Sequence, residues 1–149
     1  MNIFDDILAG VTSVTSSLWP QPAAKPGLVD GKLRPSPGTP NCVSSECGSP
    51  GERVDPLAFS GSPDAAWNTL RQVVSEMGGT VREDSGGYIW STFTVPVAGF
   101  TDDVEFRLDA AARVIHVRSA SRLGFSDLGV NRMRVEQLRA AFAKRKGDA

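Results

Sequence analysis

The sequence predicts an α+β fold in which a four-stranded antiparallel meander packs with two helices, preceded by a Pro-rich extended arm. Apolar residues recur at helical spacing in two segments, within residues 62–79 and 128–145. Between these segments lie four short runs rich in β-branched and aromatic residues. Nine of the ten prolines fall in residues 20–63, where that density prevents long helices and central strands.

The chain has 149 residues, a length that favours a single domain. We expect an amphipathic helix over residues 1–19, a linker over 20–32 and one α+β domain over 33–146, followed by a tail over 147–149. The arm with the sequence PNCVSS belongs to this domain.

Charge and hydropathy narrow the classes of function. Hydrophobic residues make up 40% of the chain and charged residues 22%, which is typical of a soluble globular protein. The net charge of −1 argues against a nucleic-acid partner. Residues 118–146 nevertheless hold eight lysines and arginines but only two acids. This basic segment either meets an external partner or docks on the acidic strand that precedes it, and we favour docking.

Residues 1–19 lack the basic start of a secretory signal, since Asp5 and Asp6 stand there, which favours a cytoplasmic location. Their apolar residues fall close to helical spacing. The segment has no Lys or Arg on its polar face, unlike most membrane-surface helices. We therefore favour a helix that covers the domain, and leave peripheral membrane attachment through residues 1–19 open.

The first helix of the domain has clear boundaries. Ser62 is a suitable N-cap, Pro63 suits the first helical position, and Asp64 suits the positive end of the helix dipole. Gly78 and Gly79 are expected to end the helix.

Four strands are expected next, over Thr80–Glu83, Tyr88–Val95, Asp102–Asp109 and Val114–Ser119. The third alternates clearly between apolar and charged side chains. A second helix is expected within Leu128–Arg145. A layer of helices on one face of an antiparallel sheet is the natural packing for this order.

Residues 118–132 contain the richest set of functional groups. They combine arginines, hydroxyls and amides between a strand and a helix start, where an anion or a carboxylate is favoured. The candidate ligand-binding residues are Arg118, Ser119, Ser121, Arg122, Ser126, Asp127, Asn131 and Arg132. In the alternative interpretation these residues hold a long connection in place, with Asn41, Asp102, Asp103 and Glu105 as structural partners.

Catalytic and metal-binding patterns are weak. Cys42 is a candidate nucleophile, and Cys42 and Cys47 are expected to be free thiols. His116 is the only histidine and lies in a predicted strand, where a solvent-facing or ion-paired role is expected. With two cysteines and one histidine we predict no metal site, and no nucleotide-binding motif suggests a cofactor.

Three blocks resemble the domain of unknown function 1499 family, which occurs in bacteria and photosynthetic eukaryotes. They are LRPSPGTPNCVSS (33–45), FTDDVEFRLD (100–109) and HVRSASRLGFSDLGVNRMRVEQLR (116–139). The resemblance implies a shared fold and site but no established activity. Members of that family often carry a cysteine where this chain has Ser36, so a cysteine pair between that position and Cys42 is absent here.

Two functions remain open. The preferred one is a non-catalytic binding or accessory domain for a small anion, a carboxylate or an acidic segment of a partner protein. The alternative is an enzyme, either thiol-dependent through Cys42 or a hydrolase that acts on an anionic substrate.

Overall fold

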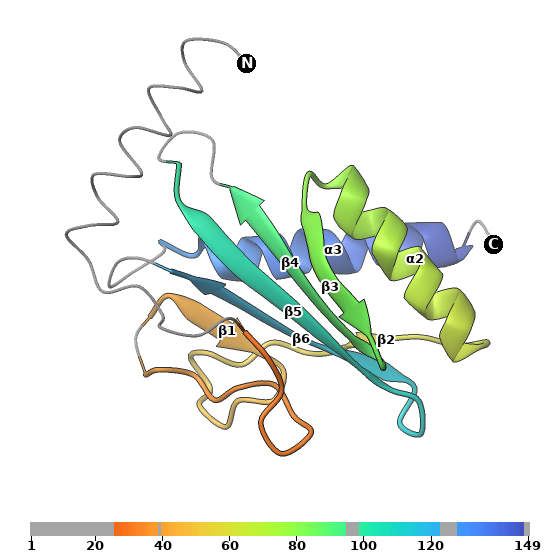
Figure 1. The fold of residues 1–149 in the computed structure, drawn as a ribbon, viewed down its shortest axis with the longest axis horizontal. Coiled ribbons are helices and arrows are strands. Elements are labelled where there is room, and N and C mark those ends of the chain that lie inside the picture. Colours follow the sequence, from red (N-terminus) through yellow and green to blue (C-terminus); the bar gives the residue numbers. More distant parts are fainter. Residues whose placement is uncertain (1–25, 39, 95–98, 123–127, 148–149) are drawn as a thin grey trace, which may run out of the picture.

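The computed structural model describes residues 26–38, 40–94, 99–122 and 128–147. These residues form an α+β fold with a mostly antiparallel sheet of six strands and two helices (Figure 1). The α+β class is therefore confirmed. The helix expected over residues 1–19 lies outside the described residues, as do Ser126 and Asp127.

Helix α2 spans Pro63–Glu76 and begins and ends as its sequence predicts. The Ser62 side chain accepts a hydrogen bond from the Ala65 N–H at 3.1 Å, and Pro63 takes the first helical position. After the helix, Gly78 has φ 86°, a left-handed conformation that favours glycine.

Four strands follow in chain order: β3 (Thr80–Ser85), β4 (Tyr88–Thr94), β5 (Thr101–Asp109) and β6 (Val114–Ser121). Each pairs antiparallel with the next. The boundaries lie within two residues of those predicted, because the alternation of side chains and the glycines of the first turn are local signals.

The sequence predicted four strands, whereas the sheet of the described residues has six. Strand β1 (Cys42–Ser44) and strand β2 (Leu57–Ala58) both pair antiparallel with β6. With three and two residues, they are too short for a periodic pattern to reveal them. Proline-rich sequence excludes long strands but permits such short edge pieces.

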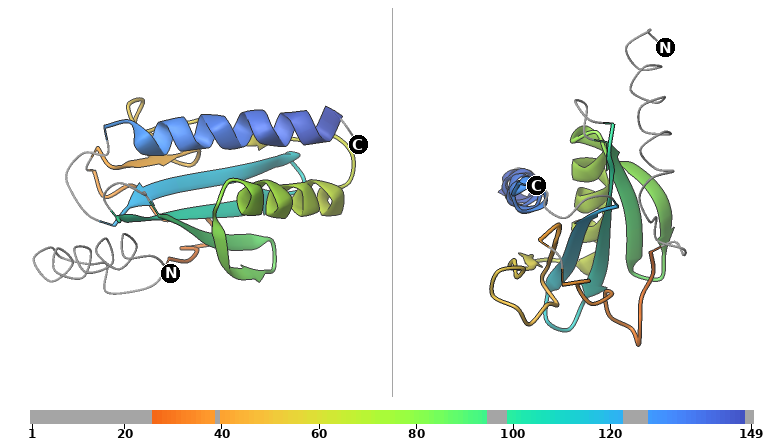
Figure 2. Two further views of the ribbon diagram at one scale, coloured as in Figure 1. Left: turned by 90° about the horizontal axis from the view of Figure 1, so that it is seen from above. Right: turned by 90° about the vertical axis from the view of Figure 1, so that its left-hand side faces the viewer.

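Helix α3 spans Val130–Gly147 and lies on the same side of the sheet as α2 (Figure 2). Its Val135, Leu138 and Phe142 are buried in one core together with inward-facing residues of α2 and of the strands, including Val104 and Phe106 of β5. Burial of this apolar surface is the main force that holds the two layers together.

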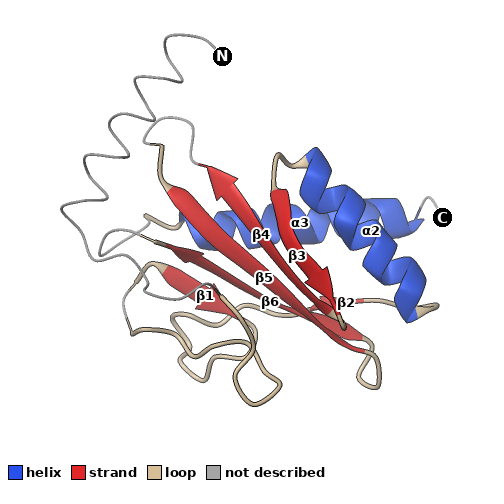
Figure 3. Ribbon diagram, viewed as in Figure 1, coloured by secondary structure: helices blue, strands red, loops and turns tan. Residues whose placement is uncertain are grey.

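The described residues before α2, 26–38 and 40–62, lie mainly in loops around β1 and β2 (Figure 3). They also cover part of the sheet face opposite the helices, where Leu33 is buried and Arg34 reaches Glu105 of β5. Both faces of the central strands are therefore shielded from water. The polar side chains of these strands consequently need hydrogen-bond or ion-pair partners within the fold.

Gly79 gives the first prediction. A Cβ atom at this position would lie 2.5 Å from Cζ of Phe93 and 2.9 Å from Cγ1 of Val74, both in the core. Gly79→Ala should therefore lower the free energy of unfolding by about 1–3 kcal/mol through overpacking, measured by urea denaturation. Gly48→Ala is the control, because its Cβ would meet no atom within 4 Å. Equal stability of the two variants would contradict this packing.

Candidate functional site

Strand β6 sends the candidate residues to opposite faces of the sheet. Because side chains alternate along a strand, Arg118 faces away from the helices, while Ser119 and Ser121 face α3. The Arg122 N–H donates to the Thr101 carbonyl at 3.3 Å, so the pairing with β5 continues past Ser121. Arg122 consequently lies on the same face as Arg118, the face turned away from the helices, which we call the outer face. The candidate residues therefore form two clusters, one on each face.

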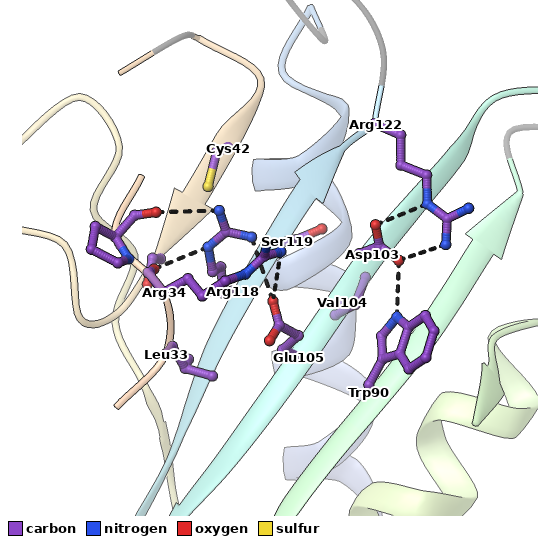
Figure 4. Close-up of polar contacts among 12 residues, drawn as sticks. Leu33, Arg34, Cys42, Trp90, Asp103, Val104, Glu105, Arg118, Ser119 and Arg122 are labelled. Atoms are coloured by element: carbon purple, nitrogen blue, oxygen red, sulfur yellow. Dashed lines mark hydrogen bonds and ion pairs between the residues drawn. The ribbon is translucent and has the colours of Figure 1, made fainter. Parts of the chain in front are cut away.

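The first cluster is centred on Glu105, whose side chain has no exposed surface. Glu105 lies directly opposite Arg118 in the sheet. Its carboxylate accepts a hydrogen bond from the Tyr88 hydroxyl at 2.7 Å and lies 3.5 Å from Arg118 and 3.6 Å from Arg34 (Figure 4). Burial raises the pKa of the Glu105 carboxyl, and the Tyr88 hydrogen bond and the two guanidinium groups oppose that effect.

Arg118 also holds the arm. Its guanidinium donates to the backbone carbonyls of Arg34 at 3.1 Å and Pro35 at 3.3 Å (Figure 4). The donors of Arg118 are thus directed at groups within the fold. These two contacts fix the course of residues 34–35 beside β6.

Arg122 pairs with Asp103 beside that cluster. Two of its nitrogens lie 2.9 Å from the two carboxylate oxygens, a bidentate geometry. The indole N–H of Trp90 donates to the same carboxylate at 2.9 Å. About a third of the Arg122 side chain remains exposed, so the pair lies at the rim of the outer face.

The second cluster lies between the sheet and the start of α3, with the buried Asn131 side chain at its centre. The Ser119 hydroxyl donates to its amide oxygen at 2.6 Å. Its amide nitrogen donates to the Ser121 hydroxyl at 2.9 Å and to the Asn41 carbonyl at 3.1 Å. One side chain of α3 therefore contacts β6 and the residue that directly precedes β1.

Arg134 completes the second cluster. Its guanidinium lies 2.8 Å from the Asp102 carboxylate and donates to the Asn131 amide oxygen at 3.0 Å. The same group lies over the Phe93 ring, 5.2 Å from its centroid, in a cation–π contact. No such role was predicted for Arg134 from the sequence, and Asp102 was named only as a structural partner of the candidate residues.

Arg132 is placed differently from the other candidates. It donates to the carbonyls of Gly51 at 2.9 Å and Arg53 at 3.1 Å, and within the described residues it makes no ion pair. It lines a pocket of about 340 Å³ at the start of α3. The pocket residues are Gly38, Pro40, Cys42, Val43, Ser49, Gly51, Glu52, Gly129 and Arg132. Two walls of the pocket thus come from the PNCVSS arm and from the start of α3.

Cys42 lines the same pocket. Burial raises the pKa of its thiol, against the opposing effects of Arg118 and of a hydrogen bond with Ser36. Figure 4 shows the sulfur directed toward the Arg118 guanidinium. Both described cysteines are free, and the Cys47 thiol donates to the Glu52 carboxylate at 3.2 Å.

A further polar group surrounds His116 on the outer face, where the sequence predicted a solvent-facing or ion-paired histidine. Its partners Ser45 and Glu46 were not predicted. The Ser45 hydroxyl lies 3.0 Å from Nδ1 of His116, and the other ring nitrogen lies 3.9 Å from the Glu46 carboxylate. This order of groups is reminiscent of a catalytic triad. Ser45 is, however, only 5% exposed, and its oxygen accepts a hydrogen bond from the Val117 N–H at 2.9 Å.

Glu46 links the segment around Leu33 to Arg107 of β5. Its carboxylate accepts hydrogen bonds from the Leu33 N–H at 2.8 Å and from the Arg107 guanidinium. Burial alone would raise the pKa of the Glu46 carboxyl, but Arg107, the Leu33 N–H and His116 outweigh it and lower that pKa. Burial lowers the pKa of His116.

In the part of the chain that the structure describes, no group of three or more His, Cys, Asp or Glu side chains is arranged to hold a metal ion. No described helix is long and apolar enough to cross a membrane.

Comparison with known proteins identifies the family. The chain matches the family model described as "Protein of unknown function (DUF1499)" over residues 32–142, and it belongs to that family. No curated protein matches the chain, and no solved structure matches it. The family match includes both polar clusters and the pocket at the start of α3.

The two ion pairs on the outer face, Arg118–Glu105 and Arg122–Asp103, should contribute differently to the free energy of unfolding. Arg118→Ala leaves the Glu105 carboxylate buried with fewer partners and should cost about 3 kcal/mol of unfolding free energy. Arg122→Ala breaks a pair at the rim and should cost about 1 kcal/mol or less. Urea denaturation of the two variants measures the difference. If the costs were equal, Glu105 would not depend on Arg118 as its burial implies.

The loss of stability at low pH should come in part from protonation of Glu46. Its folded-state pKa lies below the ordinary value of 4.5, so its contribution to stability is present above that pH. The contribution is lost as pH falls through the lower folded-state pKa. Glu46→Gln should therefore flatten the fall of unfolding free energy below about pH 5, followed by urea denaturation across pH. Glu136→Gln, which alters an exposed pair with Arg139, should leave the profile like that of the wild type.

Proposed function

We propose that this member of the family is a non-catalytic binding or accessory domain, and that its ligand occupies the pocket at the start of α3. The ligand is a small anion or a carboxylate, which includes the carboxylate of an acidic partner segment. The observation that carries the proposal is the placement of Arg132, whose guanidinium lines this pocket and pairs with no described acid.

The surroundings of Arg132 support an anionic ligand. The pocket lies where α3 begins, and the positive end of the helix dipole favours negative charge there. Its volume of about 340 Å³ falls in the range of small-molecule sites. The guanidinium is fixed by two carbonyls, so little side-chain entropy is lost when a ligand binds.

The other candidate residues act indirectly in this proposal. Arg118 holds the arm that carries Pro40 and Cys42 to the pocket wall, and Asn131 holds the start of α3 against β1. Arg122 belongs to the rim of the outer face through Asp103. We assign direct ligand contact to Arg132 and a positioning role to Arg118, Ser119, Ser121 and Asn131.

An enzyme that uses Cys42 is less well supported. A nucleophilic thiol needs a lowered pKa, whereas burial raises the pKa of Cys42. No described group is placed as its general base, since the His116 ring binds Ser45. The structure thus offers no specific argument for thiol catalysis.

The proposal is tested by NMR titration of backbone amides with acetate and, separately, with inorganic phosphate. In the wild type, the amides around the pocket should shift in a saturable manner. Arg132→Gln should weaken this binding at least about tenfold, since a charge-assisted bidentate contact is worth more than 1.4 kcal/mol.

Arg139→Gln is a matched control for that experiment. Arg139 also lies on α3 and donates to two backbone carbonyls, those of Asp55 and Pro56, but it does not line the pocket. Both variants lose comparable structural contacts, and only Arg132→Gln should lose binding. If both variants bound both anions like the wild type, the assignment of the ligand site would be wrong.

A further inference from the structure

Two charged side chains line the pocket at the start of α3, Arg132 and Glu52. They carry opposite charges. The remaining lining residues are uncharged, and burial raises the pKa of the one titratable group among them, the Cys42 thiol. A site for simple anions would gain from additional cations, not from a carboxylate. The presence of Glu52 therefore calls for an explanation in terms of the ligand.

The two charges do not neutralise each other. Arg132 donates to the carbonyls of Gly51 and Arg53, the two neighbours of Glu52 in the chain. The Glu52 carboxylate accepts a hydrogen bond from the Cys47 thiol. In the described part of the chain, no ion pair joins this carboxylate to Arg132 or to another residue. Arg132 thus donates to the backbone on both sides of Glu52, and both residues line the same pocket without forming an ion pair with each other.

We propose that the pocket selects small amphoteric molecules that carry both a carboxylate and an ammonium group, as amino acids do. This inference rests on the proposed function and specifies its ligand class. The carboxylate of the ligand binds Arg132, whose planar N–H donors match its geometry. The ammonium donates to the Glu52 carboxylate, which needs cationic donors to offset its charge.

The same pair of side chains disfavours ligands with one kind of charge. A simple carboxylate held by Arg132 shares the pocket with Glu52 and is repelled by it, whereas a simple amine held by Glu52 is repelled by Arg132. Only a ligand with both groups satisfies both walls. Discrimination of this kind depends on the repulsive contacts as much as on the attractive ones.

Three compounds of similar size distinguish these cases: L-alanine, propionate, which lacks the ammonium group, and ethylamine, which lacks the carboxylate. Each is titrated into the full chain while the backbone amides of the pocket are followed by NMR. We expect L-alanine to bind at least about tenfold more tightly than either of the other two, which corresponds to roughly 1.4 kcal/mol.

Glu52→Gln tests the role of the carboxylate. Glutamine keeps an oxygen that can accept the Cys47 thiol but has no charge, so the preference for L-alanine over propionate should fall to about onefold. Asp55→Asn removes the same charge three positions further along the chain, outside the pocket, and should keep the preference. An unchanged preference in Glu52→Gln would overturn the inference.

The outcomes separate this inference from the function on which it rests. If propionate bound the wild type as tightly as L-alanine and shifted the same amides, the amphoteric selectivity would be wrong and the anion site would stand. If neither compound shifted a pocket amide, both would fail. Should Glu52→Gln not fold, the comparison of the three compounds on the wild type still decides.

Discussion

The burial of Glu105 imposes a requirement that much of this structure meets. A carboxylate without exposed surface needs hydrogen bonds and opposite charge, or it destabilises the fold. Tyr88 from β4, Arg118 from β6 and Arg34 from the arm supply them. These residues come from distant parts of the sequence, so one buried group links the register of the sheet to the path of the arm. Without the arm, the outer face of the sheet would present this charge to water.

The elements with local signals could be predicted from the sequence. Helix α2 has a capping serine, a proline at its first position and glycines after its end. In β5, apolar and charged side chains alternate over the seven residues 103–109, and in β6 the apolar Ile115 and Val117 flank His116. By contrast, β1 and β2 are too short to show a period, and their pairing depends on an edge of β6 that only the folded sheet provides.

The partners of the arginines were harder to predict, for a related reason. An antiparallel sheet commonly leaves one face in water, so the acids of β5 could equally be exposed or paired. Here the arm covers that face, and a segment rich in proline gives no periodic sign of where it lies. The roles of Arg34 and Arg134 depend on which segments meet after folding. The composition of residues 118–132 suggested one site, whereas alternation along β6 places Arg118 on the face away from the helices and Ser119 on the face of α3.

Three arginines grip the segment before α2 in a common manner. Arg118, Arg132 and Arg139 each donate to two backbone carbonyls within that segment: those of Arg34 and Pro35, of Gly51 and Arg53, and of Asp55 and Pro56. A carbonyl oxygen is common to every amino acid, so these contacts specify a course of the main chain and not a sequence. Substitutions within the gripped segment can therefore accumulate while its course is kept. The rim of the pocket is thereby free to diversify in what it accepts, on a frame that a few guanidinium groups hold constant.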